Sequence, residues 1–327
     1  MALDKPYVVG IDIGGTNTTF GIVDTRGTIL AGGAIKTSKH VEFEEYIGQL
    51  YNEITRIVEQ ENLVGQIAGI GVGAPNANYY TGNIEYAPNL YWMKEGKRLE
   101  IIPFAETLRE KFGIPVAITN DANAAAIGEM TYGAARGMKD FIMITLGTGV
   151  GSGIVINGQV VYGHDGFAGE LGHVVMRRNN GRLCGCGRTG CLEAYASATG
   201  VARTAREYLE TRKDDSLLRN LPIDEITSKD VYDAAIAGDS LAREVYEFTG
   251  NMLGEAFADF IAFSSPKAII LFGGLTKSGE LLMRPIRESL ERNILPIFRG
   301  KTSILLSELK EGDAAVLGAS ALGWEAK

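Results

Sequence analysis

The stretch from Gly169 to Glu193 holds all three cysteines of this 327-residue chain, at positions 184, 186 and 191. One of only three histidines, His173, precedes them. Three thiolates and one imidazole form a closed four-ligand set of the kind that a structural zinc ion binds. The glycines between the cysteines allow so short a loop to fold around one ion. The sequence therefore predicts a zinc-binding loop.

Two other interpretations of the cysteines remain open. One is a glycine-rich surface loop with free thiols, although free cysteines usually scatter through a core. The other is a disulfide with one unpaired thiol, which an odd, clustered set disfavours in a protein that we expect to be cytoplasmic. Glu170 and Glu193 lie near the two ends of the stretch. A metal that fixes the loop would therefore also fix the direction of two carboxylates.

Composition excludes several classes of protein. The net charge is −8, from 32 Lys+Arg against 40 Asp+Glu, and no basic run could follow a phosphate backbone, so we expect no nucleic acid partner. No apolar run approaches the ~18 residues that span a bilayer, so we expect no membrane partner. The length favours about two domains. We expect a soluble, cytoplasmic protein.

Two strand–turn–strand units carry glycine-rich turns. The apolar run Tyr7–Ile13 breaks before a strand-like pattern resumes at residues 18–23. Glycines at such a turn let backbone N–H groups approach a bound anion. We therefore predict that this turn binds phosphate and that Asp12, beside it, binds a metal ion. A plain hairpin turn is the alternative. The turn consists of Gly14, Gly15 and Thr16.

The second unit repeats this device in the other half of the chain. Phe141–Thr145 is a predicted strand that resumes at residues 154–156, and the turn between them contains Gly147, Thr148 and Gly149. Two such turns facing each other would hold the phosphates of one nucleotide. The pair Gly273 and Gly274, after the predicted strand 268–272, is either a bare turn or a surface for the flat face of a base.

Asp121 is the first candidate for catalysis. The predicted strand Val116–Thr119 ends in Asn120 and Asp121, and a helix rich in small residues follows at 122–130. A carboxylate at the end of a strand and the start of a helix is well placed for chemistry. The alternative is that Asp121 only caps the helix.

Hydrophobic periodicity and turn signals predict the remaining elements. Strands are expected at 29–35 and 67–72, a long polar and aromatic loop at 78–97, and a type I′ turn at Asn157 and Gly158. Helices are predicted at 43–58, 101–112, 193–210, 229–237, 241–263 and 314–324.

Five motifs together resemble the ROK family of sugar kinases and sugar-responsive repressors. They occur in the family's order and cover nearly the whole chain. The resemblance implies an α/β fold of the actin-like, hexokinase-like ATPase type, with two domains built on mixed sheets, and a homodimer. We expect domains at 1–120, with the helix at 313–327 packing back on it, and at 121–312. The motifs are DIGGT at Asp12–Thr16, NDANAAA at Asn120–Ala126, LGTGVGSG at Leu146–Gly153, GELGH at Gly169–His173 and CGCGRTGCLE at Cys184–Glu193.

The resemblance also implies roles for single residues. Asp121 would be the base, and Asn120, Glu170, His173 and Glu193 would contact the sugar, with Asn76 and Asn89 on the same side. The zinc ligands would be His173, Cys184, Cys186 and Cys191. The phosphate turns would be Asp12 with Gly14, Gly15 and Thr16, and Gly147, Thr148 and Gly149; Gly273 and Gly274 would lie at the adenosine end. The sequence GAPN at 73–76 departs from the family, since many members carry a second glycine after the proline.

The expected function is therefore that of a hexose kinase that uses ATP, Mg²⁺ and a structural Zn²⁺, with glucose phosphorylated at its 6-hydroxyl as the first choice. Alternatives are kinases for N-acetylmannosamine, N-acetylglucosamine, fructose or allose, and a sugar sensor without catalysis. A repressor would need a DNA-binding segment ahead of this region, and only eleven residues precede Asp12.

Overall fold

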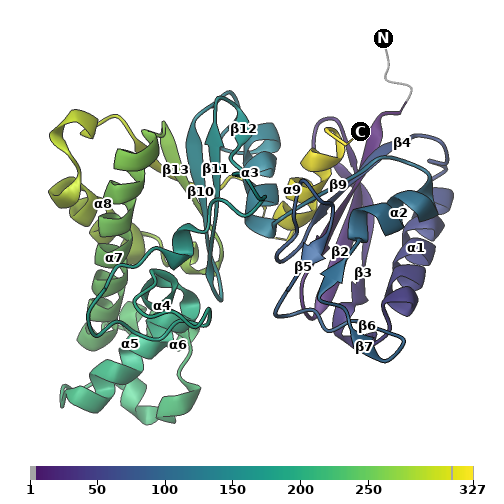
Figure 1. Cartoon of the computed structure of the whole chain (residues 1–327). Helices are drawn as coiled ribbons and strands as arrows, with labels where there is room; N and C mark the ends of the chain where they lie inside the picture. Colours follow the sequence, from purple (N-terminus) through teal and green to yellow (C-terminus); the bar gives the residue numbers. More distant parts are fainter. Residues whose placement is uncertain (1–4, 311, 327) are drawn as a thin grey trace.

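The computed structural model describes residues 5–310 and 312–326. Two five-stranded mixed sheets lie in separate halves of the molecule, in the orders β3-β2-β1-β4-β9 and β12-β11-β10-β13-β14 (Figure 1). In both sheets three antiparallel strands are followed by two parallel ones. The two glycine-turn units, β1–β2 and β10–β11, therefore hold equivalent positions in the two sheets.

The first sheet forms from apolar runs that are buried along most of their length, except for the edge strand β3, which alternates between buried or half-buried and exposed residues. Its helices α1 (Phe43–Gln60) and α2 (Phe104–Phe112) contribute Tyr46, Leu50 and Phe104 to one core, which Trp92 joins from the long loop. Two short hairpins fold that loop: β5 (Ile84–Glu85) with β8 (Ile101–Ile102), and β6 (Met93–Lys94) with β7 (Lys97–Arg98). The strands of the sheet are β1 (Tyr7–Ile13), β2 (Asn17–Asp24), β3 (Ile29–Lys36), β4 (Ile67–Gly73) and β9 (Val116–Thr119).

The helix predicted from residue 101 is wrong at its start. Ile101 and Ile102 pair with β5, and α2 begins only at Phe104. Pro103 occupies the N-cap position, and a proline disfavours helical backbone in the residue before it. The two isoleucines match the helical period but are held in a strand.

The second sheet is covered by the longer helices of the chain. Helix α7 (Ser240–Ser264), predicted at 241–263, buries Val245, Met252 and Phe257. Asn157 and Gly158 both have positive φ, at 54° and 76°, as the predicted type I′ turn requires. The other elements are β10 (Phe141–Leu146), β11 (Val150–Ile156), β12 (Gln159–Val160), β13 (Ala268–Phe272), β14 (Ser303–Leu306), α4 (Glu193–Ala196), α5 (Ala198–Thr211), α6 (Ser228–Ile236) and α8 (Glu280–Asn293).

Two features of this half differ from the sequence interpretation. The helix predicted at 193–210 is two helices, because Ser197 has extended backbone and its side chain accepts a hydrogen bond from the Gly200 N–H as the N-cap of α5. Helix α8 and strand β14 were not predicted. Pro285 lies inside α8, where a proline normally breaks a helix. It packs against Gly250 of α7, which leaves room for its ring.

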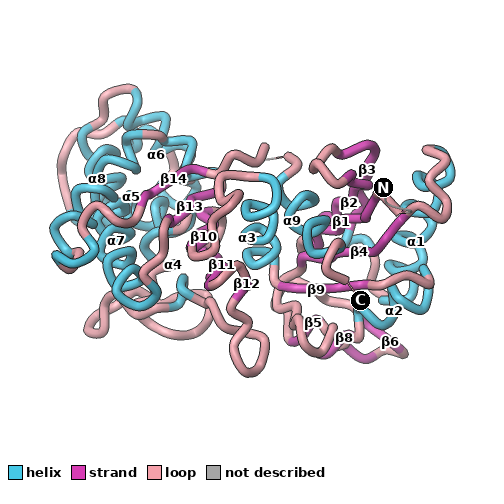
Figure 2. Tube along the Cα trace, turned by 90° about the horizontal axis from the view of Figure 1, so that it is seen from above, coloured by secondary structure: helices cyan, strands magenta, loops and turns pink. Residues whose placement is uncertain are grey.

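Helices α3 (Asp121–Tyr132) and α9 (Ala314–Gly323) lie side by side between the two sheets (Figure 2). Helix α9 rests on β1 and β4 of the first sheet. This approach is so close that a Cβ on Gly71 would lie 1.9 Å from the Ala319 carbonyl oxygen. The division into domains at 1–120 with 313–327 and at 121–312 stays a prediction, and its ends at 1–4 and 327 lie outside the described residues. No helix within the described residues has the length and apolar character needed to cross a bilayer.

A second contact joins the two halves, and we call it the tyrosine clasp: residues 78–80 from the first half against 162–165 from the second. The rings of Tyr79 and Tyr162 stack, with centroids 4.1 Å apart and planes 4° from parallel. The Asn78 amide Nδ2 donates to the Asp165 carbonyl at 2.8 Å, and the Tyr80 hydroxyl donates to the Gly163 carbonyl at 2.9 Å.

Asn78→Ala is expected to destabilise the protein by about 1–3 kcal/mol, because Asn78 is buried and its loss leaves the Asp165 carbonyl and the Tyr80 N–H without partners. Tyr80→Phe is the matched variant, and we expect a loss of about 1 kcal/mol or less because that hydroxyl lies at an exposed site. Urea unfolding of both variants measures the difference. If both variants lost the same free energy of unfolding, the buried Asn78 amide would not contribute more to stability than the exposed Tyr80 hydroxyl.

Candidate functional site

The first glycine turn is a tight connection between β1 and β2. The Gly14 N–H donates to the Asn17 carbonyl at 2.9 Å, and Ile13 pairs with Thr18. Gly15 faces the long loop, since a Cβ on it would lie 2.9 Å from the Asn89 carbonyl oxygen. Asn89, predicted on the sugar side, therefore lies against the predicted phosphate turn.

The second glycine turn is fastened to the start of α5. The Gly147 N–H donates to the Gly149 carbonyl at 3.1 Å. From α5, the Ala198 N–H donates to the Gly147 carbonyl at 2.8 Å, and the Thr199 hydroxyl donates to the Thr148 carbonyl at 3.0 Å. The turn is thus held from both its own strands and the neighbouring helix.

The glycine pair after β13 lies next to this second turn. Gly273 has a φ of 110°, and a Cβ on it would lie 2.5 Å from the Leu146 carbonyl oxygen. Around Gly274 a Cβ would meet no atom of the described residues within 4 Å. The structure therefore brings residues 147–149 and 273–274 together, with open space beside the second glycine.

Asn120 and Asp121 start helix α3 at the carboxyl end of β9. One oxygen of each side chain accepts a hydrogen bond from the Ala122 N–H at 2.8 Å. The N-cap of α3 is Asn120, and Asp121 is the first residue of the helix. The bond from the Ala122 N–H uses only one of the two carboxylate oxygens of Asp121. Asp121 is surrounded by protein atoms, which desolvate its carboxyl group, yet part of the residue remains open to solvent. Capping and chemistry do not exclude each other at this position.

Asp12 and Asp121 face each other across Gly73. A Cβ on that glycine would lie 3.8 Å from Asp12 Oδ1 and 3.7 Å from the Asp121 Cα. Burial, and then the negative charge of Asp121, raise the pKa of Asp12 from 3.8 to about 6. Burial also raises the pKa of Asp121, and the hydrogen bond from the Ala122 N–H partly offsets that rise. Two acidic side chains thus lie close together beside Gly73, and a bound cation at this place would stabilise the ionised form of both.

Asp12→Asn is expected to stabilise the protein at pH 8 by up to about 3 kcal/mol, because the variant has no carboxylate to ionise at this buried position. The figure is the free energy that corresponds to a pKa raised from 3.8 to about 6. A raised carboxyl pKa favours the protonated form in the folded state. The contribution of Asp12 to the free energy of unfolding is fully present below about pH 4, where the carboxyl is protonated, and is lost as the pH rises through about 6. The advantage of the variant should therefore shrink between pH 8 and pH 4.5 in urea unfolding.

Asp24→Asn is the matched control. Although burial acts to raise it, the pKa of Asp24 lies below its ordinary value because the backbone N–H groups of Thr28 and Arg26 donate to its carboxylate. The ionised Asp24 carboxylate therefore stabilises the folded protein at neutral pH, and this stabilisation is lost as the pH falls and the carboxylate is protonated. This variant should therefore lose stability at pH 8, and a stabilised Asp24→Asn or an unstabilised Asp12→Asn would contradict the assignment.

A small cavity, which we call the asparagine pocket, lies at the start of α3. It collects three of the residues predicted to contact sugar: Asn76, Asn120 and Glu170. Asn76 has a φ of 54° and its amide donates to the Tyr86 carbonyl at 3.2 Å. Five lining residues were not predicted: Asn123, Ser152, Gly166, Phe167 and Ala168. Two of them carried a signal, Asn123 as part of the NDANAAA motif and Ser152 as part of LGTGVGSG.

The predicted zinc ligands form one cluster. The ligand atoms of His173 and the three cysteines all lie within 4.8 Å of one another. His173 Nδ1 lies 3.8 Å from the Cys184 sulfur, and the sulfurs of Cys186 and Cys191 lie 3.7 Å apart. In a tetrahedral zinc site, bonds of about 2.0–2.3 Å place neighbouring ligand atoms about 3.5–3.8 Å apart. The cluster therefore fits one zinc ion, bound by the Nδ1 of the histidine.

The two carboxylates of this stretch lie on different sides of the cluster. Glu170 Oε2 lies 3.9 Å from the other ring nitrogen of His173, Nε2. Glu193 Oε2 accepts a hydrogen bond from the Val150 N–H at 2.9 Å, and its Oε1 lies 3.4 Å from the Cys184 sulfur. Glu193 thus joins the cysteine cluster to the second glycine turn, a contact that the sequence did not predict.

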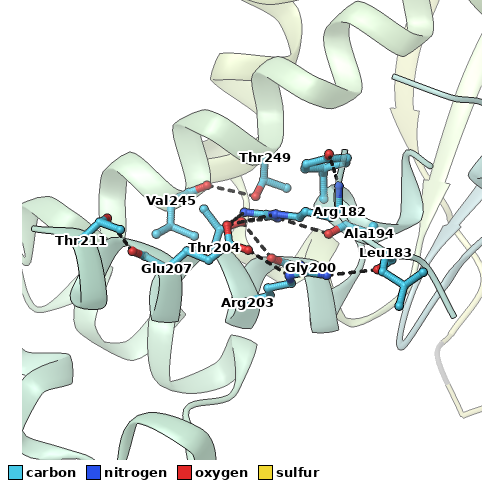
Figure 3. Close-up of polar contacts among 11 residues, drawn as sticks. Arg182, Leu183, Ala194, Gly200, Arg203, Thr204, Glu207, Thr211, Val245 and Thr249 are labelled. Carbon is cyan, nitrogen blue, oxygen red and sulfur yellow. Dashed lines mark hydrogen bonds and ion pairs between the residues drawn. The ribbon is translucent and has the colours of Figure 1, made fainter. Parts of the chain in front are cut away.

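Arg182 anchors this loop to the helices behind it (Figure 3). Its guanidinium donates to the Ala194 carbonyl at 3.2 Å, to the Thr204 hydroxyl at 2.9 Å and to Glu207 at 3.1 Å. Its charge also lies over the ring of Tyr195, 4.7 Å from the centroid. The side chain is 9% exposed, so this buried arginine is fully paired into the structure that supports the cluster.

Comparison with known proteins gives the family. The model of the ROK family matches residues 8–326. A glucokinase of Halalkalibacterium halodurans is 36% identical over 326 residues, which cover 98% of this chain and 95% of the relative. A crystal structure of a ROK family glucokinase from Streptomyces griseus, in complex with glucose and AMPPNP, is 32% identical, with a TM-score of 0.76 over 98% of this chain and 99% of that one.

A xylose repressor of Caldicellulosiruptor bescii is more distant, at 28% identity over 98% of this chain and 78% of the repressor. The predicted α/β fold with two mixed sheets is confirmed. Family model and relatives both extend over nearly all of the sequence, and the chain belongs to the ROK family.

Proposed function

We propose that the protein is an ATP-dependent hexose kinase that phosphorylates the 6-hydroxyl of glucose. The observation that carries the proposal is the position of Asp121, which borders the asparagine pocket through Asn120 and lies beside Asp12 at the first glycine turn. A sugar that places one hydroxyl in the pocket and a phosphate at the turn would meet at this carboxylate. The relatives named glucokinase, and the related structure with glucose and AMPPNP, support glucose and ATP as the substrates.

Asp121 would act as the base. Phosphoryl transfer asks mainly for positioning and for neutralisation of charge, so few reactive groups are needed. The attacking sugar hydroxyl must lose its proton, and a carboxylate whose pKa is raised by burial is a better acceptor than an ordinary one. The bond from the Ala122 N–H fixes the direction of the carboxyl group.

The two glycine turns would hold the triphosphate of ATP between them. Their backbone N–H groups can approach charged oxygens closely because Gly14, Gly15, Gly147 and Gly149 have no side chains. The space beside Gly274 would receive the adenosine end. Mg²⁺, when bound, would supply positive charge to the phosphates, and the carboxylate of Asp12, close to Asp121, would be an oxygen ligand for it.

The zinc ion would be structural. His173 and the three cysteines supply four protein ligands, which leaves no open position for substrate. Because Nδ1 of His173 faces the sulfurs, Nε2 would remain for the sugar side, together with Glu170. Zinc would thereby hold sugar-binding groups in place without taking part in the reaction.

The test is a coupled assay of ADP release with ATP, Mg²⁺ and a panel of hexoses and N-acetylhexosamines, with a zinc determination on the same sample. Turnover on glucose with about one zinc per chain is the expected result. Turnover only on an amino sugar or on fructose would overturn glucose as the substrate but keep the kinase mechanism. Sugar binding with zinc present and no turnover would favour a sensor, as in the more distant repressor relatives.

A further inference from the structure

Asn123 carries a buried hydrogen-bond acceptor that is not used. The residue is 3% exposed on helix α3, and its Oδ1 has no hydrogen-bond partner within the described residues. Buried polar atoms in native proteins are nearly always paired, because an unpaired acceptor loses its bonds to water and gains none. An exception inside a cavity points to a group that the cavity binds.

The side chain lines the asparagine pocket beside Asn120. Residues of an α-helix are rotated by about 100° from one to the next, so Asn123 lies about 60° from Asn120 around the helix, on the side away from Asp121. Asp121 and Asn123 therefore flank Asn120 on opposite sides. A sugar with one hydroxyl at Asp121 would present a different hydroxyl, from its ring, to Asn123.

The opposite wall of the pocket is held in place. Gly166, Phe167 and Ala168 form this wall, and the tyrosine clasp ties the preceding Asp165 to Asn78. On the far side, the Leu171 N–H donates to the Ser152 hydroxyl at 3.0 Å, and that hydroxyl donates to the Gly169 carbonyl. A pocket with fixed walls can select among hydroxyl positions, because a misplaced group finds no partner.

We propose that Asn123 Oδ1 accepts a hydrogen bond from a ring hydroxyl of the sugar, one other than the hydroxyl that is phosphorylated, and thereby selects substrates that carry it. The inference rests on the proposed kinase function and deepens it. The donor chemistry, an O–H group, is shared by a sugar hydroxyl and an ordered water, and the test below distinguishes the two sources.

The test compares glucose with 2-deoxy-, 3-deoxy- and 4-deoxyglucose in the wild type and in Asn123→Leu, which keeps a similar volume and removes the acceptor. In the wild type, the sugar that lacks the bonded hydroxyl should lose about 10- to 100-fold in kcat/KM relative to glucose. In Asn123→Leu the same two sugars should differ by only a few-fold. Asn123→Asp restores an acceptor oxygen and should restore the discrimination.

Two further variants separate this role from a structural one. Asn123→Ala repeats the test if the leucine does not fold, and Asn52→Leu on the exposed face of α1 is the control, in which the ratios between sugars should stay as in the wild type. Without sugar, the midpoint of thermal unfolding of Asn123→Leu should be unchanged or higher, since an unpaired buried acceptor is removed. A side chain with only a structural role would lower it.

Equal losses for all four sugars in the variants would indicate an ordered water or a packing role, and would overturn the proposal. So would a wild type that accepts every deoxy sugar as well as glucose. If the wild type phosphorylates no sugar, the proposed kinase function fails, and calorimetric binding of the same sugars to the same variants still decides the role of Asn123.

Discussion

Asp121→Asn is expected to lower kcat by about 10²- to 10⁴-fold, the range that a positioned general base contributes. The change keeps the size of the side chain and an oxygen that can accept the hydrogen bond from the Ala122 N–H. The cap of α3 and the fold should therefore survive. What is lost is the oxygen that can take a proton from the sugar hydroxyl.

Binding of sugar should be nearly unchanged in this variant, because Asn120, Asn76 and Glu170 still line the pocket. Steady-state kinetics give kcat, and titration calorimetry with glucose gives the dissociation constant. Asp259→Asn, an exposed carboxylate on α7, is the control and should keep the wild-type rate. Asp121→Asn that binds glucose and retains most of the rate would remove Asp121 as the base.

The pH dependence of the wild type adds a second measurement. A base works only when deprotonated, so kcat/KM should fall as the pH drops through the pKa of Asp121. Because burial raises that pKa, the fall should begin at a higher pH than for an ordinary aspartate. Burial and the charge of Asp121 raise the pKa of the neighbouring Asp12 to about 6. Because the two carboxyls interact, the pH profile should give apparent pKa values that belong to the pair and not to either residue alone.

The strands and the two glycine turns were predictable because their signals are local. The first strand of each hairpin, β1 or β10, is a mostly apolar run, and a turn with glycines follows it, as at Gly14 and Gly147. The return strand β11 begins at Val150, before the predicted start at 154, because Gly151 and Gly153 lie in the strand and not in the turn. Burial on both faces of a sheet selects such runs. The amphipathic helix α1 shows the helical period because one of its faces meets the core, whereas α7 is buried on more than one face.

The errors have causes that lie elsewhere in the molecule. Helix α8 was not predicted because Pro285 within it is a local signal against a helix. The glycine that makes room for this proline, Gly250, lies in another helix. Ile101 and Ile102 belong to a strand because β5 pairs with them. In the same way, the break at Ser197 allows α5 to begin where its first residues can hold the second glycine turn.

In the candidate site, too, the parts with local sequence signals were predictable and the parts built by residues distant in sequence were not. The cysteine cluster is visible in the sequence because its ligands are close in the chain and chemically distinctive. The asparagine pocket is not, since Asn76 of the first half meets Asn123 and Phe167 of the second only after the two halves come together. The tyrosine clasp and the bond from Val150 to Glu193 also join residues that are distant in sequence. No local period marks such pairs.

Cys184→Ser is expected to remove zinc and to lower kinase activity by about 10²-fold or more. Cys184 is buried, its sulfur lies 3.8 Å from His173 Nδ1, and a serine hydroxyl is a poor zinc ligand. Without the ion, His173 and Glu170 lose the support that fixes their direction at the pocket, and Glu193 loses a neighbour that helps hold it on the Val150 N–H.

The loss should be local to the loop rather than global. Arg182 keeps its own bonds to Thr204 and Glu207, and the core beneath α5 and α7 does not depend on the cysteines. Hydrogen exchange should therefore rise across residues 173–193 while β10 and α7 remain protected. Asn179→Ala, an exposed change in the same loop, should keep both zinc and activity. A Cys184→Ser protein that contains no zinc, shows an exposed loop and still phosphorylates glucose at the wild-type rate would show that the metal does not position the sugar-binding groups.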